Sequence, residues 1–195
     1  MKFYNFVRDA VGIIFKRLYK IKVFNKENVP KEGKIILCSN HISLLDPITV
    51  ALAVDRQVFF MAKKELFKNK LFGAILKKLG AFPVNRKKSD LTAIKNSLKL
   101  LKKDNALGLF PEGTRVKNKD LDSVKPGVAM ISLKSKAPII PIYIDSKYKK
   151  FKDVKVYIGK PIYFKEYEGQ KLNLEDYKKL SKSVMETIYM LDTIN

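Results

Sequence analysis

The chain has 195 residues, the length of one domain with a hydrophobic core of its own. Its 40 Lys and Arg against 19 Asp and Glu give a formal net charge of +21, more than solubility requires, and this excess argues for an anionic partner such as a nucleic acid or a membrane surface. A single cysteine, Cys38, and a single histidine, His41, exclude an intrachain disulfide and argue against a zinc site, and no stretch approaches the roughly 20 apolar residues of a membrane-spanning helix.

The first predicted element is an amphipathic helix from Phe3 to Tyr19. Apolar residues recur there at helical spacing, and four basic side chains between Arg8 and Lys20 are available to face lipid headgroups. The same pattern also suits a helix packed on the domain, and the two interpretations are compatible. We therefore predict a membrane-associating helix over residues 1–20, followed by an α/β domain over residues 21–195.

Short apolar runs then alternate with helical patterns along the chain. The predicted strands cover residues 34–39, 58–62, 82–84, 106–110 and 139–144. The predicted helices cover residues 46–54, 65–79, 89–103 and 128–136. Strands that alternate with helices are typical of a parallel sheet. The predicted fold is therefore a single α/β domain with a largely parallel mixed sheet flanked by helices.

The ends of these elements carry more specific expectations. Ser89 is a candidate N-cap for the helix that follows it. Residues 154–158 and 162–164 are expected to form a hairpin at the edge of the sheet, and an amphipathic pattern from Leu174 to Leu191 predicts a last helix.

One stretch, Asn-His-Ile-Ser-Leu-Leu-Asp-Pro over residues 40–47, places His41 five positions ahead of Asp46. An unperturbed imidazole titrates near pH ~6.5, so His41 can accept and return a proton while Asp46 fixes its tautomer. An Asp before a Pro is also a good helix N-cap, and one carboxylate can serve both purposes. The chain holds no G-x-S-x-G motif, which indicates that the histidine activates a substrate hydroxyl. Ser43 and Cys38 are alternative nucleophiles, and we interpret both as structural.

Three further motifs follow in order: Phe-Pro-Val-Asn-Arg over residues 82–86, Phe-Pro-Glu-Gly-Thr-Arg over residues 110–115 and Pro-Ile-Ile-Pro-Ile over residues 138–142. Together with residues 40–47, they resemble the four sequence blocks of the glycerolipid acyltransferases. The resemblance implies transfer of a fatty acyl group from an acyl thioester to the sn-2 hydroxyl of 1-acyl-glycerol-3-phosphate. The product would be phosphatidic acid, an intermediate of phospholipid biosynthesis.

The resemblance also assigns roles to single residues. It makes His41 and Asp46 the catalytic pair. It places substrate binding on Arg86, Glu112, Gly113, Thr114 and Arg115. A glycine permits close backbone approach and an arginine fork matches a phosphate, but a carboxylate beside an anion is awkward. Holding the loop or an arginine by hydrogen bonds is therefore an equally good interpretation of Glu112.

The implied partners are an anionic phospholipid membrane, a lysophosphatidic acid acceptor and a thioester donor carried by acyl carrier protein or coenzyme A. No cofactor and no metal are expected. A nucleic acid is disfavoured because no nucleic-acid-binding module is evident and the lysines are spread along the whole chain. Moving each methylene of an acyl chain out of a bilayer costs about 0.8 kcal/mol. We therefore expect a peripheral or monotopic enzyme at the cytoplasmic face of the cell membrane.

Two other functions remain open on the sequence. A sister acyltransferase that acts on glycerol-3-phosphate or another lysolipid would carry the same four blocks. A basic membrane- or nucleic-acid-binding module without catalysis would carry them by coincidence, although the intact His41 and Asp46 argue against that alternative.

Overall fold

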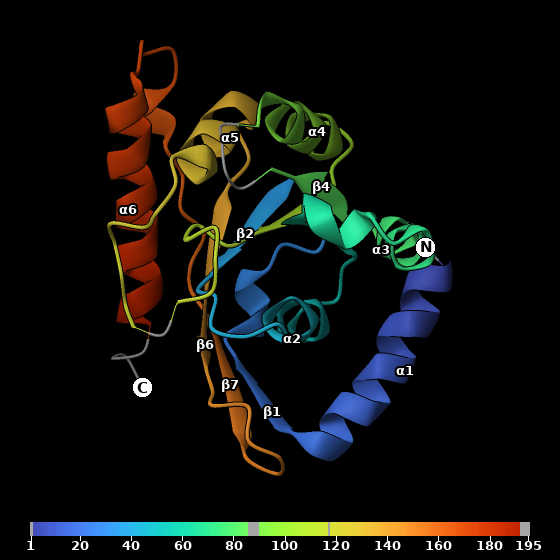
Figure 1. The fold of residues 1–195 in the computed structure, drawn as a ribbon. Helices are drawn as coiled ribbons and strands as arrows, with labels where there is room; N and C mark the ends of the chain where they lie inside the picture. Colours follow the sequence, from blue (N-terminus) through green and yellow to red (C-terminus); the bar gives the residue numbers. More distant parts are fainter. Residues whose placement is uncertain (1, 86–89, 117, 192–195) are drawn as a thin grey trace.

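The computed structural model describes residues 2–85, 90–116 and 118–191, and these form one α/β domain around a seven-stranded sheet (Figure 1). The strands are β1 (Lys20–Phe24), β2 (Ile35–Ser39), β3 (Val58–Lys63), β4 (Phe82–Val84), β5 (Ala106–Leu109), β6 (Ile139–Asp145) and β7 (Asp153–Ile158). They lie in the order β1-β7-β6-β2-β5-β3-β4, and neighbours run parallel except for the antiparallel pair β6 and β7. The predicted fold class is confirmed.

Helices cover both faces of this sheet (Figure 1). They are α1 (Lys2–Leu18), α2 (Asp46–Ala53), α3 (Lys70–Lys78), α4 (Leu91–Leu101), α5 (Gly127–Ser135) and α6 (Leu174–Met190). Apolar side chains of α4, α5 and α6 form one core with the sheet, and those of α2 form a second core on the opposite face. The strands between the two cores are buried from both sides, which explains why β2, β5 and β6 are continuous apolar runs.

The first helix packs on the outside of α2. Tyr4, Gly12 and Phe15 are its buried residues, and a Cβ atom at Gly12 would come within 3.1 Å of Leu52 Cδ2. Phe3, Phe6, Ile13 and Ile14 are exposed, and the remaining large apolar residues of the helix are half-buried, as expected for an amphipathic helix that rests on a domain. Across the described residues, we find no helix long and apolar enough to cross a membrane.

One strand was missed and one predicted pairing of strands is wrong. The edge strand β1 was not predicted, because its alternating sequence Lys-Ile-Lys-Val-Phe is too short and too polar to stand out beside the long helix before it. The expected hairpin of residues 154–158 and 162–164 does not form: β7 lies between β1 and β6 and pairs with both, whereas Ile162 makes a single bridge to Ile139. The apolar pattern of residues 154–158 predicts a strand there, but the neighbours with which that strand pairs depend on the order of all strands in the sheet.

Two helix starts also differ from the predictions. The segment predicted as one helix over residues 65–79 is a short 3-10 turn, η2 (Lys64–Phe67), followed by α3, whose N-cap Asn69 accepts a hydrogen bond from the Phe72 N–H at 3.0 Å. Helix α4 begins at Leu91, and its N-cap is Asp90, which accepts from the Ala93 N–H at 3.0 Å. The predicted cap, Ser89, lies outside the described residues.

Candidate active site

His41 lies on the loop that follows β2, at the carboxyl end of the sheet, and its backbone is hydrogen-bonded to the loop after β5. The His41 N–H donates to Glu112 Oε2 at 2.7 Å, and the His41 carbonyl accepts from the Val116 N–H at 2.9 Å. On the other side, the Asn40 side chain accepts from the Ile144 N–H at 2.8 Å and donates to the Ile144 carbonyl at 3.0 Å. The histidine backbone is therefore fixed between β5 and β6.

The imidazole of His41 contacts Asp46 inside this loop. His41 Nδ1 lies 2.8 Å from Asp46 Oδ2, and the two residues are 5% and 0% exposed. The ring stacks on Phe110, with centroids 4.2 Å apart and an angle of 23° between the planes. A carboxylate at Nδ1 favours the tautomer that carries its proton there, which leaves Nε2 with a lone pair. The two predicted catalytic residues are thus brought together in the geometry of a general base.

The expected helix N-cap at Asp46 is wrong. Leu45 is the N-cap of α2, and Asp46 is the first helical residue, with no side-chain capping bond. Its Oδ2 atom instead accepts from the backbone N–H groups of Ile42 and Ser43, both at 2.7 Å. The loop between β2 and α2 curls back over the carboxylate, so Asp46 satisfies the loop and the imidazole rather than the helix.

Two tyrosines that the sequence motifs do not contain complete the site. The Tyr148 hydroxyl, from the loop between β6 and β7, donates to Asp46 Oδ1 at 2.7 Å. The Tyr189 hydroxyl, from the last turn of α6, donates to Glu112 Oε1 at 2.7 Å. Neither side chain belongs to a recognisable pattern, and no sequence signal pointed to either of them.

Glu112 is 1% exposed, and its two oxygens are occupied by the Tyr189 hydroxyl and the His41 N–H. Burial raises the pKa of Glu112 from 4.5 to about 7, against the opposing effect of these two hydrogen bonds. This position favours the loop-holding interpretation of Glu112 over direct contact with an anion.

Three of the remaining predicted binding residues follow Glu112 directly in the chain. Gly113 adopts a φ of +69°, in the left-handed region that side chains disfavour, so it allows the loop to turn outward. Thr114 and Arg115 follow, and both are exposed. Arg86 lies outside the described residues.

The alternative nucleophiles have structural surroundings. Cys38 is fully buried on β2, and burial raises the pKa of its thiol well above the ordinary value, which disfavours the reactive thiolate. The Ser43 hydroxyl accepts from the Leu45 N–H at 3.2 Å within the loop. Over the described residues, no group of three or more His, Cys, Asp or Glu side chains could hold a metal ion.

The fold is an α/β domain with a mainly parallel sheet, and a buried histidine–carboxylate pair at the carboxyl end of that sheet has the arrangement of an enzymatic base. A family model described as Acyltransferase matches residues 20–145, and the chain belongs to this acyltransferase family. The resemblance of the four sequence blocks is thereby confirmed, and the protein is an acyltransferase.

Individual relatives agree with this assignment. The chain is 36% identical over 167 residues to the 1-acyl-sn-glycerol-3-phosphate acyltransferase of Bacillus subtilis (strain 168), covering 82% of each protein. It is 32% identical over 193 residues to the protein of the same name from Streptococcus pneumoniae, covering 95% of this chain and 69% of that one. The crystal structure of the 1-acyl-sn-glycerophosphate acyltransferase PlsC from Thermotoga maritima matches with a TM-score of 0.67 and 26% identity, over 88% of this chain and 72% of that one.

Proposed function

We propose that this acyltransferase transfers a fatty acyl group from a thioester of acyl carrier protein or coenzyme A to the sn-2 hydroxyl of 1-acyl-glycerol-3-phosphate, giving phosphatidic acid. The observation that carries the proposal is the buried contact between His41 Nδ1 and Asp46 Oδ2 at 2.8 Å, in a chain whose relatives bear the name of this activity. Such a pair supplies the base that an alcohol needs before it can attack a thioester.

In the proposed reaction, His41 Nε2 accepts the proton of the sn-2 hydroxyl as the hydroxyl oxygen attacks the thioester carbonyl carbon. The new C–O ester bond forms, the C–S bond breaks, and the imidazolium returns the proton to the departing thiolate. Asp46 keeps the proton on Nδ1 and stabilises the imidazolium, with its charge held by the Ile42 and Ser43 N–H groups. No cofactor is needed for these steps.

We further propose that the phosphate of the acceptor binds beside this pair. Arg115 offers a guanidinium fork and Thr114 a hydroxyl, both on the exposed part of the loop that Glu112 fastens to His41. Arg86, from the second sequence block, would supply another fork. Arg115 immediately precedes Val116, whose N–H donates to the His41 carbonyl at 2.9 Å. Arg115 is therefore adjacent in the chain to a residue that contacts the proposed base.

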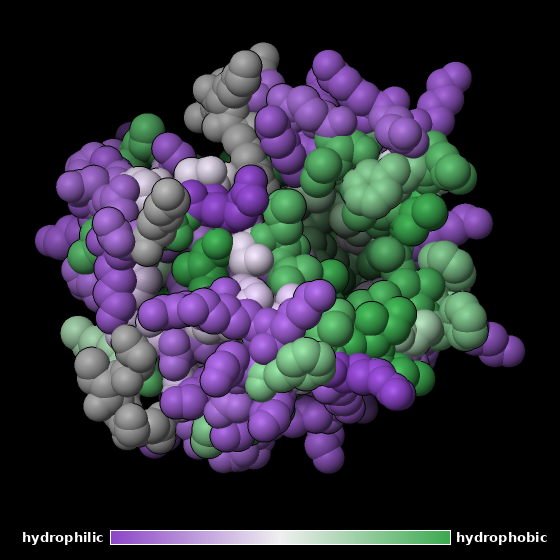
Figure 2. Space-filling model, turned by 60° about the horizontal axis from the view of Figure 1, so that its bottom comes forward, coloured by the Kyte–Doolittle hydropathy of each residue, from purple (hydrophilic) through white to green (hydrophobic). Residues whose placement is uncertain are grey.

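Membrane association is proposed from an exposed apolar surface that α1 and α3 share. This α1–α3 surface consists of Phe3, Phe6, Ile13 and Ile14 of α1 with Leu71, Phe72 and Ile75 of α3. Lys78 Nζ lies 5.7 Å from the centre of the Phe3 ring and so joins the two helices. Figure 2 shows hydrophobic residues gathered around a hollow on the side of the molecule where α1 and α3 lie in Figure 1. A patch of this kind on a basic protein marks a surface for a lipid interface.

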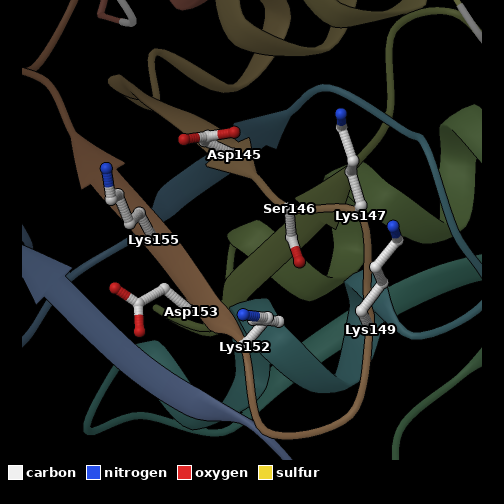
Figure 3. A pocket seen from close by; sticks show the side chains of 7 residues that line it. All are labelled: Asp145, Ser146, Lys147, Lys149, Lys152, Asp153 and Lys155. Carbon is white, nitrogen blue, oxygen red and sulfur yellow. The ribbon is translucent and has the colours of Figure 1, made fainter.

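Basic side chains flank the end of α1. Lys147, Lys149 and Lys152 stand on the loop between β6 and β7 and, with Lys155, line an open hollow (Figure 3). The loop adjoins α1, because the Phe151 N–H donates to the Leu18 carbonyl at 2.7 Å. Each lysine near an anionic leaflet contributes about 1 kcal/mol of attraction. We therefore propose a peripheral enzyme on the cytoplasmic face of an anionic membrane.

A panel of acceptors tests the proposed reaction. Thiol release from acyl-coenzyme A, and separately from acyl carrier protein, is followed with 1-acyl-glycerol-3-phosphate, glycerol-3-phosphate, lysophosphatidylcholine and monoacylglycerol. We expect the fastest release with 1-acyl-glycerol-3-phosphate. A preference for glycerol-3-phosphate or another lysolipid would indicate the sister acyltransferase instead, and no release with any pair would favour a binding module.

Vesicle sedimentation tests the membrane proposal. Phe6→Ser and Ile13→Ser remove exposed apolar side chains of α1 and leave its packed residues intact, so each should weaken binding to anionic vesicles about 10-fold without lowering the melting temperature. Leu174→Ser, at a residue on α6 that is 62% exposed, is the matched control and should bind as the wild type does. Equal binding by all three variants would contradict the proposed surface.

A further inference from the structure

Tyr148 reaches the catalytic pair from a distant part of the chain. It lies on the loop between β6 and β7, the loop seen in Figure 3, and is 102 residues from Asp46. Its hydroxyl donates to Asp46 Oδ1 at 2.7 Å and lies 2.9 Å from Thr49 Oγ1 on α2. The three donors from residues 41–43 all reach the other oxygen, Oδ2. Tyr148 therefore fixes the side of the carboxylate that the histidine loop does not hold.

The backbone of this loop is shaped to point the ring inward. Tyr148 has a φ of +47°, in the left-handed region that residues other than glycine rarely adopt. Its N–H donates to Ser146 Oγ at 2.9 Å, which supports the turn. A strained conformation persists only where the surroundings impose it, and such residues concentrate at functional sites.

Aromatic contacts brace the ring from the first helix. The Tyr19 ring meets the Tyr148 ring edge to face, with centroids 5.9 Å apart at 89°, and Tyr19 in turn packs on Phe15 of α1 at 4.7 Å. A continuous line of contacts therefore runs from Phe15 through Tyr19 and Tyr148 to Asp46 and the imidazole of His41.

The hydroxyl is protonated at neutral pH and can donate. Burial, followed by the neighbouring Asp46 carboxylate, raises the pKa of Tyr148 far above its ordinary value. A protonated phenol beside a carboxylate donates, and hydrogen bonding to the charged form of the carboxylate stabilises it.

We propose that Tyr148 is a positioning residue for acyl transfer: by holding Asp46 Oδ1, it keeps the carboxylate in line with His41 Nδ1 and keeps the base lone pair on Nε2. The inference deepens the proposed function and rests on the role of His41 as the base. The tyrosine acts through Asp46 and needs no contact with substrate.

Tyr148→Phe tests the proposal, because it removes the hydroxyl and keeps the ring. We expect kcat to fall about 10-fold, while the KM values for acceptor and donor stay within about 2-fold. Tyr157→Phe is the matched control: Tyr157 lies on β7, stacks on Phe24 at 4.8 Å and makes none of the contacts with Asp46. It should keep the wild-type kcat.

A double-mutant cycle distinguishes action through Asp46 from a general loosening of the fold. If Tyr148 works by holding the carboxylate, Tyr148→Phe lowers kcat about 10-fold in the wild type but less than about 2-fold in an Asp46→Asn background. The chain has a single histidine, so 15N NMR of the imidazole also reports His41 alone. We expect Tyr148→Phe to increase the population of the tautomer protonated at Nε2, and Tyr157→Phe to leave it unchanged.

Full additivity with Asp46→Asn, or a kcat equal to that of Tyr157→Phe, would overturn the proposal. If Tyr148→Phe is less folded by circular dichroism at the assay temperature, Tyr19→Leu carries the same test. This change removes the Tyr19 ring that braces Tyr148 and keeps the Tyr148 hydroxyl. It should lower kcat about 3-fold at unchanged KM, and an unchanged kcat would again overturn the proposal. An active His41→Ala variant would instead refute the proposed base, and so separates the two failures.

Discussion

Residues 40–46 and residues 113–115 lie on adjacent loops after the neighbouring parallel strands β2 and β5, but their side chains are held in opposite ways. His41 and Asp46 are buried, and hydrogen bonds from three parts of the chain fix their positions. Thr114 and Arg115 are exposed on a loop that turns outward at Gly113. A buried pair and an exposed pair therefore stand on two adjacent loops, although they are distant in the sequence.

The difference matches the two tasks that we propose for these residues, proton transfer for His41 and phosphate binding for Arg115. A proton acceptor contributes most to the rate when its orientation is set before the substrate arrives, and hydrogen bonds from neighbouring segments fix the loop that carries His41. A phosphate-binding side chain can remain hydrated until the ligand replaces its water, and its binding energy is gained at that moment. Burial of the pair lowers the free energy of unfolding at neutral pH, because Glu112, which holds the loop, must also be buried.

Removal of the proposed base is expected to have the largest effect on activity. His41→Ala should lower kcat by about 10²- to 10⁴-fold, because general-base assistance is worth that much. The rate is measured with saturating acyl-coenzyme A and 1-acyl-glycerol-3-phosphate. Circular dichroism and vesicle binding should match the wild type, since the loop keeps its other hydrogen bonds. Retention of about a tenth or more of the wild-type rate would exclude His41 as the base.

The cost of burying Glu112 should appear as a dependence of stability on pH. Its pKa is raised to about 7 in the folded protein, so folding favours the protonated form, and stability declines as pH rises from about 4.5 to about 7. Glu112→Gln has no charge to bury. Between pH 5 and pH 8, the free energy of unfolding should therefore change in favour of Glu112→Gln by up to about 3 kcal/mol relative to wild type.

Chemical denaturation at each pH measures this difference. The control is Glu166→Gln, at an exposed glutamate, which should follow the wild-type dependence. If Glu112→Gln and wild type show parallel curves over this range, Glu112 is not the group that limits stability at neutral pH.

Arg115, on the exposed loop, is expected to affect binding of the acceptor. Arg115→Ala should raise the KM for 1-acyl-glycerol-3-phosphate about 10- to 100-fold and leave the KM for the donor and kcat largely unchanged, because a charge-assisted hydrogen bond is worth about 1.5 to 3 kcal/mol. Arg115→Lys keeps the charge without the fork and should recover part of the loss. Steady-state kinetics, with acceptor and donor varied in turn, measures kcat and both KM values for each variant. An equal rise in KM for monoacylglycerol, which has no phosphate, would place Arg115 outside the phosphate site.

The smallest effect is expected at Gly113, where the exposed loop turns outward. Gly113→Ala places a side chain at a φ of +69° and should lower the free energy of unfolding by about 1 kcal/mol. Gly127→Ala is the matched control, since Gly127 begins α5 and an added Cβ meets nothing within 4 Å. That change should be neutral or slightly stabilising in thermal denaturation. A Gly113→Ala protein as stable as Gly127→Ala would show that the turn tolerates side chains.

Local patterns in the sequence were enough to predict the contact between His41 and Asp46 and most of the helices and strands. His41 and Asp46 are five residues apart, one on the loop after β2 and the other at the start of α2, so their contact needs no knowledge of the rest of the fold. Strands β2, β5 and β6 are buried on both faces and are therefore continuous apolar runs. Helices α1 and α6 are buried on one face and therefore show helical periodicity, and both patterns can be read from the sequence. For the same reason, the parallel α/β class was predicted correctly.

The tertiary structure alone decided what surrounds that pair. Tyr148 is 102 residues from Asp46, and Tyr189 is 77 residues from Glu112, so neither contact leaves a trace in local spacing. Whether they form depends on the strand order that sets β7 beside β6 and β1, and on the packing of α6 against the opposite face. The capping role expected of Asp46 failed for a related reason: a carboxylate accepts from whichever donors the folded chain brings to it, and here those donors are the loop, the imidazole and a distant phenol.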